Sequence, residues 1–154
     1  MEIKTLASAE AVAREGAAII AAAARAAVAA RGRFVLAVSG GHAPWLMLRD
    51  LASEDVPWGG VHVAQVDERV APAGDPDRNL THLRESLLKH APLRAEQVYA
   101  MPVETSDLEA AASRYAQTLH VIRLAAGIRS RPSGPWARRP YRLSGALGSG
   151  GRRD

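Results

Sequence analysis

The feature that most constrains the fold is a short apolar run, Phe34–Val38, with Ser39, Gly40 and Gly41 directly behind it. Five consecutive apolar side chains predict a strand that is buried on both faces, as in a parallel sheet covered by helices. The two glycines allow a tight turn after the strand, and Pro44 suits the first turn of a helix. The sequence therefore predicts a strand–loop–helix unit of an α/β fold.

The same alternation continues through residue 119. An Ala-rich helix precedes the strand, with Ser8 as its N-cap and Gly32 as its stop. Helices and strands then alternate, and Ser106 opens a capping-box sequence. This order predicts an α/β, three-layer fold with a mainly parallel, Rossmann-like sheet. The expected helices cover residues 8–30, 44–51, 80–90 and 107–119, and the further expected strands cover residues 61–66 and 98–101.

Composition excludes several classes of protein. The chain has no cysteine, which excludes disulfides and thiolate metal sites, and its five histidines lack metal-ligand spacing. No apolar run reaches the length of a membrane span, and the first residues lack the pattern of a signal peptide. We expect a cytoplasmic protein without metal, cofactor or membrane partner.

Charge is distributed unevenly along the chain. Residues 1–119 hold 12 Lys and Arg against 15 Asp and Glu, whereas residues 120–154 hold 8 Arg and a single acid, Asp154. The basic part is rich in Arg, Gly, Ser and Pro, a composition typical of disorder. It is either a nucleic-acid-binding arm or a piece of coding unrelated to the body.

Two motifs carry candidate chemistry. Backbone N–H groups in the Ser39-Gly40-Gly41 loop, before a helix N-terminus, suit a phosphate, and His42 is expected to face that ligand. A plain tight turn explains the same pattern. His62, in the second expected strand, is expected to be a packed or edge residue, and the helical histidines, His82, His90 and His120, are expected to be solvated. Trp45 and Trp58 are expected in the core.

The second motif, Asp67-Glu68-Arg69, ends the second expected strand. Ligands of open α/β sheets bind outside the carboxyl ends of strands, where both motifs fall. Arg69 can grip a phosphate through two hydrogen bonds, and Asp67 can orient a substrate hydroxyl. A surface salt-bridge cluster is the alternative.

Together the segments FVLAVSGGHAPWLML, VHVAQVDERVAPAGDPDRNLTHLRESLL and VYAMP resemble the 6-phosphogluconolactonases of the glucosamine-6-phosphate deaminase superfamily, over residues 5–119. The resemblance implies hydrolysis of 6-phospho-D-glucono-1,5-lactone to 6-phosphogluconate in the pentose phosphate pathway, by general-base attack of water. Asp67 would position the sugar or the water. The phosphate- and substrate-binding residues implied are Ser39, Gly40, Gly41, His42, Arg69 and Asn79.

One departure from the family pattern concerns the phosphate contacts, and one residue distinguishes the two branches of the superfamily. The family usually has Ser or Thr where His42 and Ala43 stand, and its deaminase branch has Tyr after Asp-Glu, so Arg69 favours the lactonase branch. A deaminase or isomerase of the same superfamily is the alternative enzyme. A non-catalytic protein with a nucleic-acid-binding tail is the alternative from another class, although a sugar phosphate, and no nucleic acid, is the expected partner.

Codon logic accounts for the tail. The family continues with the signature LGLGPDGHTASL, whose His is its proposed general base. Residues 137–144, ARRPYRLS, can be coded GCC CGA CGG CCA TAC CGC CTC TCT, which reads PDGHTASL when shifted by one base. Residues 128–136 can likewise give FDLVHLGLG. We therefore expect residues 120–154 to be a disordered, out-of-frame tail on a truncated domain, with the slip between Leu119 and Ile128 and little activity.

Overall fold

The computed structural model describes residues 3–125 and 127 as a parallel three-stranded sheet with helices on both sides. The strands β1, β2 and β3 lie side by side in sequence order, and each pairs with the next in parallel. This confirms the predicted α/β class and the parallel sheet. The elements are α1 (Ala9–Arg31), β1 (Phe34–Val38), α2 (His42–Leu51), β2 (Val61–Gln65), α3 (Asn79–Leu83), β3 (Val98–Tyr99) and α4 (Leu108–Ala125), with short turns η1 (Trp58–Gly60), η2 (Arg84–Leu88) and η3 (Ala95–Gln97).

Helix α1 begins and ends where the sequence predicts. The hydroxyl of Ser8 accepts a hydrogen bond from the N–H of Ala11 at 3.2 Å, and Gly32 closes the helix in the left-handed region with φ 72°. Small alanines let α1 approach the rest of the domain closely. The buried positions recur at helical spacing, at Ala13, Ala17, Ala21, Ala24 and Ala27.

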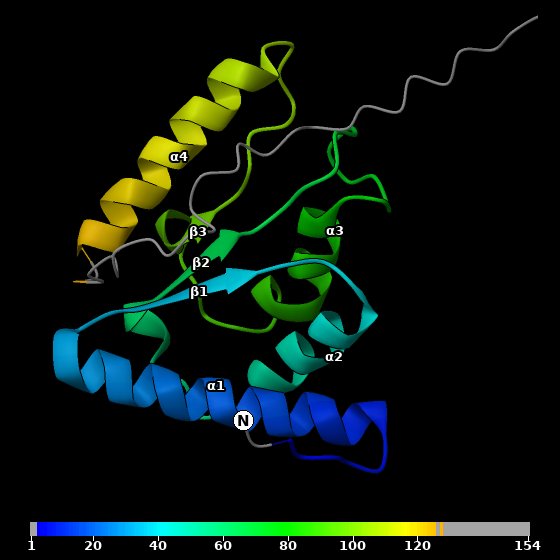
Figure 1. Ribbon diagram of the computed structural model, residues 1–154, viewed down its shortest axis with the longest axis vertical. Helices are drawn as coiled ribbons and strands as arrows, with labels where there is room; N and C mark the ends of the chain where they lie inside the picture. The colour runs from blue at the N-terminus through cyan, green and yellow to red at the C-terminus, as the bar shows by residue number, and fades with distance from the viewer. Residues whose placement is uncertain (1–2, 126, 128–154) are drawn as a thin grey trace, which may run out of the picture.

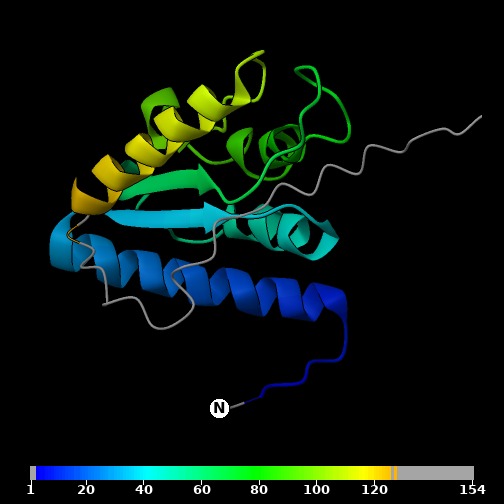
Figure 2. The ribbon, with the colours of Figure 1, turned by 45° about the horizontal axis from the view of Figure 1, so that its top comes forward.

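The helices form the outer layers of the domain. Figures 1 and 2 show α1 on one side of the sheet and α4 on the other. One continuous core joins α1, α2 and the α3–η2 segment to the sheet, and Leu48, Leu51 and Leu87 are each at most 1% exposed. Trp58 belongs to this core, as predicted.

Two helices differ from the sequence prediction. The segment expected as one helix over residues 80–90 is a short α-helix, α3, followed by the π-type turn η2. Helix α4 does not end at Leu119 but continues to Ala125, because Ile122 is buried and holds another turn against the domain. The tail expected to be disordered and out of frame covers residues 120–154; its first residues, 120–125, are helical, which corrects that expectation, and residues 126 and 128–154 lie outside the described residues.

Candidate functional site

The register of β1 and β2 brings the two predicted motifs together. Val38 pairs with Gln65, and the N–H of Val66 donates to the Val38 carbonyl at 2.8 Å, so both strands end at the same level. Ser39 and Asp67 follow directly. The Ser39 hydroxyl donates to Oδ1 of Asp67 at 2.7 Å, which confirms that the two motifs share one edge of the sheet.

Asn79, the first residue of α3, completes a three-residue cluster. Its Nδ2 donates to Oδ2 of Asp67 at 3.0 Å and to the Asp67 carbonyl at 3.2 Å. Each carboxylate oxygen of Asp67 therefore holds one protein donor and retains room to accept another hydrogen bond. The carboxylate has a fixed orientation and can receive a hydroxyl or a water from a ligand.

Gly40 is required by this packing. A Cβ atom added there would lie 1.9 Å from Oδ1 of Asn79, closer than any real contact. The loop therefore needs glycine at this position so that the Asn79 side chain can reach Asp67. Gly41 has φ 119°, a backbone conformation that other residues rarely adopt.

The cluster opens onto a hollow of about 560 Å³, a volume in the range of small-molecule sites. Five of the predicted phosphate- or substrate-binding residues contribute to it together with Asp67, whereas His42 does not. His42 faces a neighbouring hollow of about 170 Å³ between α2 and the α3–η2 segment. The larger hollow is lined by Ser39, Gly40, Gly41, Trp45, Asp67, Arg69, Pro76, Asp77, Asn79 and His82.

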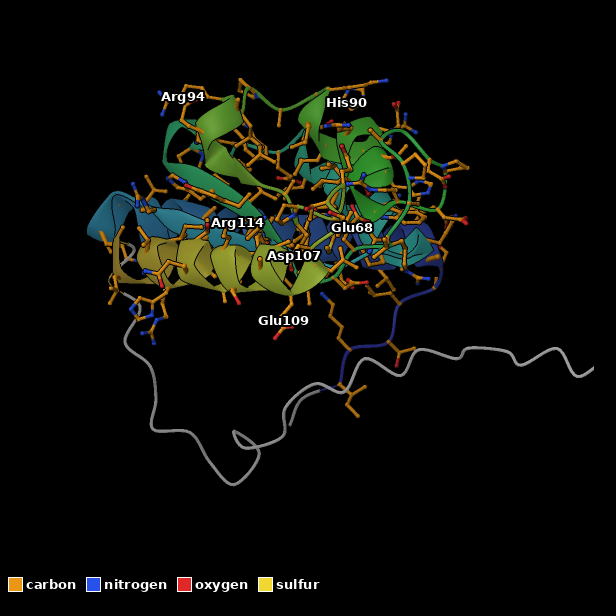
Figure 3. All side chains as sticks on the ribbon, turned by 90° about the horizontal axis from the view of Figure 1, so that it is seen from above. Glu68, His90, Arg94, Asp107, Glu109 and Arg114 are labelled. Atoms are coloured by element: carbon orange, nitrogen blue, oxygen red, sulfur yellow. The ribbon has the colours of Figure 1, made fainter. Side chains whose placement is uncertain are left out.

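Glu68 supports the site from behind. Its side chain is fully buried, and Figure 3 shows it within the body of the domain, whereas Glu109 projects from α4. The Glu68 carboxylate accepts two hydrogen bonds from the backbone N–H groups that open α3, those of Asn79 at 2.7 Å and Leu80 at 3.0 Å. It also accepts from the N–H of Arg69 and from Nε2 of Gln65. Glu68 thus fixes both Arg69 and Asn79 through their backbones.

Arg78 neutralises this buried carboxylate. Its Nε lies 3.3 Å from Oε2 of Glu68, and its Nη1 lies 2.5 Å from Oε1 of Glu104 in the segment before α4. Burial opposes ionisation of Glu68, but its hydrogen bonds outweigh burial and hold the pKa below the ordinary value. For Arg78, burial likewise opposes the charge, and the two carboxylates more than compensate, so its pKa is raised.

The same network reaches α4. Gln65 is 3% exposed; its Oε1 accepts the N–H of Met101 at 2.9 Å, and its carbonyl accepts the Tyr115 hydroxyl at 2.7 Å. Burial raises the pKa of Tyr115. Gln65 of β2 and Tyr115 of α4 thus hold this edge of the sheet in one arrangement. The contacts of Arg78 with Glu68 and Glu104 belong to the same network.

Sequence reasoning missed four residues around the site. The sequence interpretation gives Glu68 and Arg78 no role of their own, although an acid at the end of a predicted strand and a base ten residues later, just before a predicted helix, is a usable signal. His82 was expected to be solvated, and Trp45 to be in the core. The expectation for Trp45 is wrong, because it is half-buried and lies outside the core cluster, whereas His82 is half-buried and stays partly exposed while its ring stacks on Trp45 beside the hollow.

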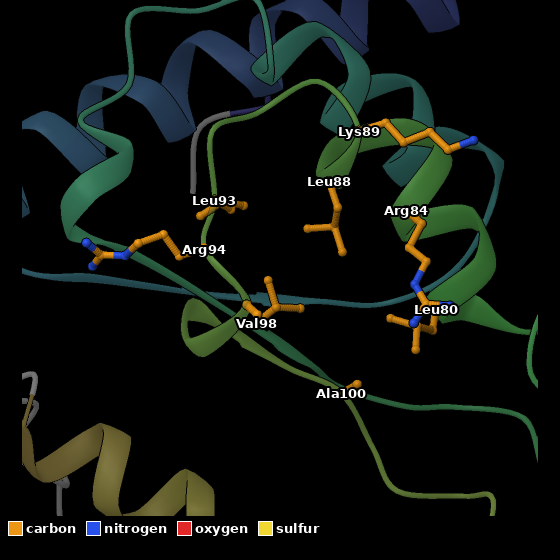
Figure 4. A pocket seen from close by; sticks show the side chains of 9 residues that line it. Leu80, Arg84, Leu88, Lys89, Leu93, Arg94, Val98 and Ala100 are labelled. Atoms are coloured by element: carbon orange, nitrogen blue, oxygen red, sulfur yellow. The ribbon is translucent and has the colours of Figure 1, made fainter.

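A further hollow, of about 490 Å³, lies beside β3 and shares no residue with the candidate site. Figure 4 shows Leu88, Leu93 and Val98 pointing into it. Its floor is apolar, and its charged groups are the basic side chains Arg84, Lys89 and Arg94. No carboxylate side chain lines it that could orient a substrate hydroxyl as Asp67 can.

The described residues hold neither a candidate metal site nor a candidate membrane span. No three His, Asp or Glu side chains there are grouped so that they could hold a metal ion. Over the same part of the chain, every helix is too short or too polar to cross a bilayer.

Sequence comparison places residues 7–132 in the family described as glucosamine-6-phosphate isomerases/6-phosphogluconolactonase. A 6-phosphogluconolactonase of Mycobacterium leprae is 40% identical over 99 residues, which are 60% of this chain and 40% of that protein. The 6-phosphogluconolactonase of a Nostoc species is 31% identical over 96 residues, 62% of this chain and 40% of that protein. This chain thus spans about two fifths of the length of the curated relatives it matches.

Solved structures agree with this assignment. A 6-phosphogluconolactonase from Shewanella baltica superimposes with a TM-score of 0.66 at 30% identity, over 75% of this chain and 49% of that one. A monomeric glucosamine-6-phosphate deaminase superimposes with a TM-score of 0.68 over 79% of this chain and 51% of that one, but at 19% identity it shows the shared fold alone. By sequence and by fold, the chain belongs to the glucosamine-6-phosphate isomerase/6-phosphogluconolactonase family.

Proposed function

We propose that the chain carries the phosphate- and hydroxyl-binding half of a 6-phosphogluconolactonase site. The observation that carries the proposal is the Ser39–Asp67–Asn79 cluster, whose donors hold one carboxylate rigidly at the edge of a hollow that Arg69 also lines. A cation and a fixed acceptor in one hollow suit a ligand with a phosphate and several hydroxyl groups.

Each residue has a stated role in the proposal. Arg69 binds the phosphate of 6-phospho-D-glucono-1,5-lactone, helped by backbone N–H groups of the Ser39–Gly41 loop. Asp67 accepts a hydrogen bond from a sugar hydroxyl or from the water that attacks the lactone carbonyl. Ser39 and Asn79 keep that carboxylate in place. The setting we propose is the pentose phosphate pathway in the cytoplasm.

Arg69 also separates this proposal from a deaminase activity. The curated relatives named above are 6-phosphogluconolactonases, and the Arg that follows Asp67-Glu68 is the residue by which the sequence resembles that branch. A hydrolase acting on the lactone is therefore favoured over an enzyme acting on glucosamine 6-phosphate. A binding assay that compares the affinities of the chain for 6-phosphogluconate and for glucosamine 6-phosphate tests this preference.

The central experiment is calorimetric titration of the chain with inorganic phosphate and with 6-phosphogluconate, the product of the proposed reaction. Arg69→Ala should weaken both ligands by about 10- to 100-fold, because a hydrogen bond to a charged group contributes about 1.5–3 kcal/mol. Arg114→Ala, which removes an exposed Arg on α4 outside the hollow, is the control and should bind as the wild type does. Equal affinities for Arg69→Ala and wild type would overturn the proposal.

A further inference from the structure

Trp45 of α2 and His82 of α3 form a stacked pair beside the site. Their ring centroids lie 3.8 Å apart with an angle of 18° between the planes. Nothing can enter between rings at that distance, so only their edges and outer faces are accessible. Both residues line the hollow that contains Asp67, and both also line the smaller hollow beside His42. The pair is therefore the partition between the two hollows.

A hydrogen bond fixes the His82 ring. Its Nε2 lies 2.7 Å from the carbonyl oxygen of Pro76. Because a carbonyl oxygen only accepts, Nε2 carries the proton and donates. Pro76 and Asp77 form the rim of the site hollow, and the Asp77 N–H is held by Oδ1 of Asp75 at 2.8 Å. His82 thus ties this rim to α3 while its ring stays against Trp45.

The stacked pair differs chemically from the rest of the lining. Ser39, Asp67, Arg69 and Asn79 offer charge and hydrogen bonds, which suit a phosphate and hydroxyl groups. The indole and imidazole rings instead offer flat, weakly polar surfaces, which suit the C–H groups of a sugar carbon skeleton. A bare phosphate ion has no such groups and gains nothing from this wall.

We propose that the Trp45–His82 wall determines the selectivity of the site for a sugar phosphate over inorganic phosphate. The proposal rests on the proposed function, since it concerns the same hollow. The polar cluster and Arg69 bind the groups that both ligands share. The wall contacts the carbon skeleton, and its position depends on the stacking of the two rings.

Three variants of the full chain test this inference, with inorganic phosphate and 6-phosphogluconate as the titrated ligands. His82→Gln keeps an N–H donor for the Pro76 carbonyl but removes the ring. His82→Phe keeps a ring for stacking but removes the donor. Trp45→Leu removes the other ring. Thermal unfolding of each variant shows whether it folds, and having a variant on each side of the stack keeps the test valid if one fails to fold.

His82→Gln and Trp45→Leu should bind 6-phosphogluconate about 2- to 10-fold more weakly, the size of an aromatic contact, with affinity for inorganic phosphate unchanged. His82→Phe should keep the wild-type ratio of the two affinities. If the ratio of the two affinities stays at the wild-type value in His82→Gln and Trp45→Leu, with both affinities either unchanged or reduced in parallel, the proposed role of the Trp45–His82 wall is overturned. Arg69→Ala tests the proposed function independently of the wall. If this variant binds both ligands as tightly as wild type does, the proposed function fails.

Discussion

Glu68 and Arg78 form an ion pair of 3.3 Å in which the two side chains are 0% and 2% exposed. Each is the chain neighbour of a residue in the candidate site, Glu68 of Asp67 and Arg78 of Asn79. The pair therefore connects the end of β2 to the start of α3 directly behind the Asp67–Asn79 contact. Buried charges need such partners, and Glu68 has Arg78 while Arg78 has both Glu68 and Glu104.

We expect Glu68→Gln to lower the free energy of unfolding by about 1–3 kcal/mol, because an amide cannot accept all the N–H donors that the Glu68 carboxylate accepts, while Arg78 keeps Glu104 as its charged partner. The matched control is Glu85→Gln, which breaks an exposed pair with Lys89 one helical turn away. It should leave the free energy of unfolding nearly unchanged, because an exposed ion pair contributes little. Urea unfolding followed by circular dichroism measures both values, and similar losses in the two variants would contradict the assigned role of Glu68.

Stability should fall in acid partly through Glu68. Its pKa in the folded chain lies below the ordinary value of 4.5, so its contribution is complete above that pH and is lost as the pH falls through the lower, folded-state pKa. Urea unfolding at a series of pH values from neutral to acid measures the loss. Glu68→Gln should show a shallower decline than wild type, whereas Glu85→Gln should keep nearly the full decline. Parallel curves for Glu68→Gln and wild type would exclude Glu68 as a source.

Gly40→Ala should impair ligand binding more than stability. The added Cβ would overlap Oδ1 of Asn79 at 1.9 Å, so the Asn79 side chain must leave Asp67. Losing that hydrogen bond frees the carboxylate and should weaken 6-phosphogluconate binding by about tenfold, the equivalent of about 1.4 kcal/mol. Gly59→Ala, where no atom lies within 4 Å of the added Cβ, is the control. Wild-type affinity in Gly40→Ala would show that the contact is dispensable.

The nucleotide sequence between the codons for Leu119 and Ile128 tests the origin of the tail. We expect a one-base correction there to restore the segment LGLGPDGHTASL and its His. The 154-residue chain should hydrolyse the lactone at close to the spontaneous rate. The protein encoded by the corrected gene should hydrolyse it about 10²–10⁴-fold faster, which is the usual contribution of a general base. Comparable turnover by the two purified proteins would contradict the frameshift.

Much of the fold could be predicted from local sequence. Ser8, the alanine spacing and Gly32 determine α1 because capping and helix propensity act over a few residues. The apolar runs of β1 and β2 predict buried parallel strands for the same reason. The carboxyl edge of a parallel sheet then follows from geometry, so the meeting of Ser39 and Asp67 was predictable before their 2.7 Å hydrogen bond was seen.

Contacts between distant segments were decided only by the tertiary structure. Trp45 and His82 are 37 positions apart, and no local pattern distinguishes a core tryptophan and a solvated histidine from a stacked pair beside a hollow. The same holds for Arg78, which reaches Glu68 and Glu104 at once, and for α4, which continues past Leu119 because Ile122 finds a buried position. Sequence determined which elements form and where their polar ends meet, because those depend on short-range propensity and strand direction. Packing decided which side chains touch, because that depends on how segments remote along the chain share one volume.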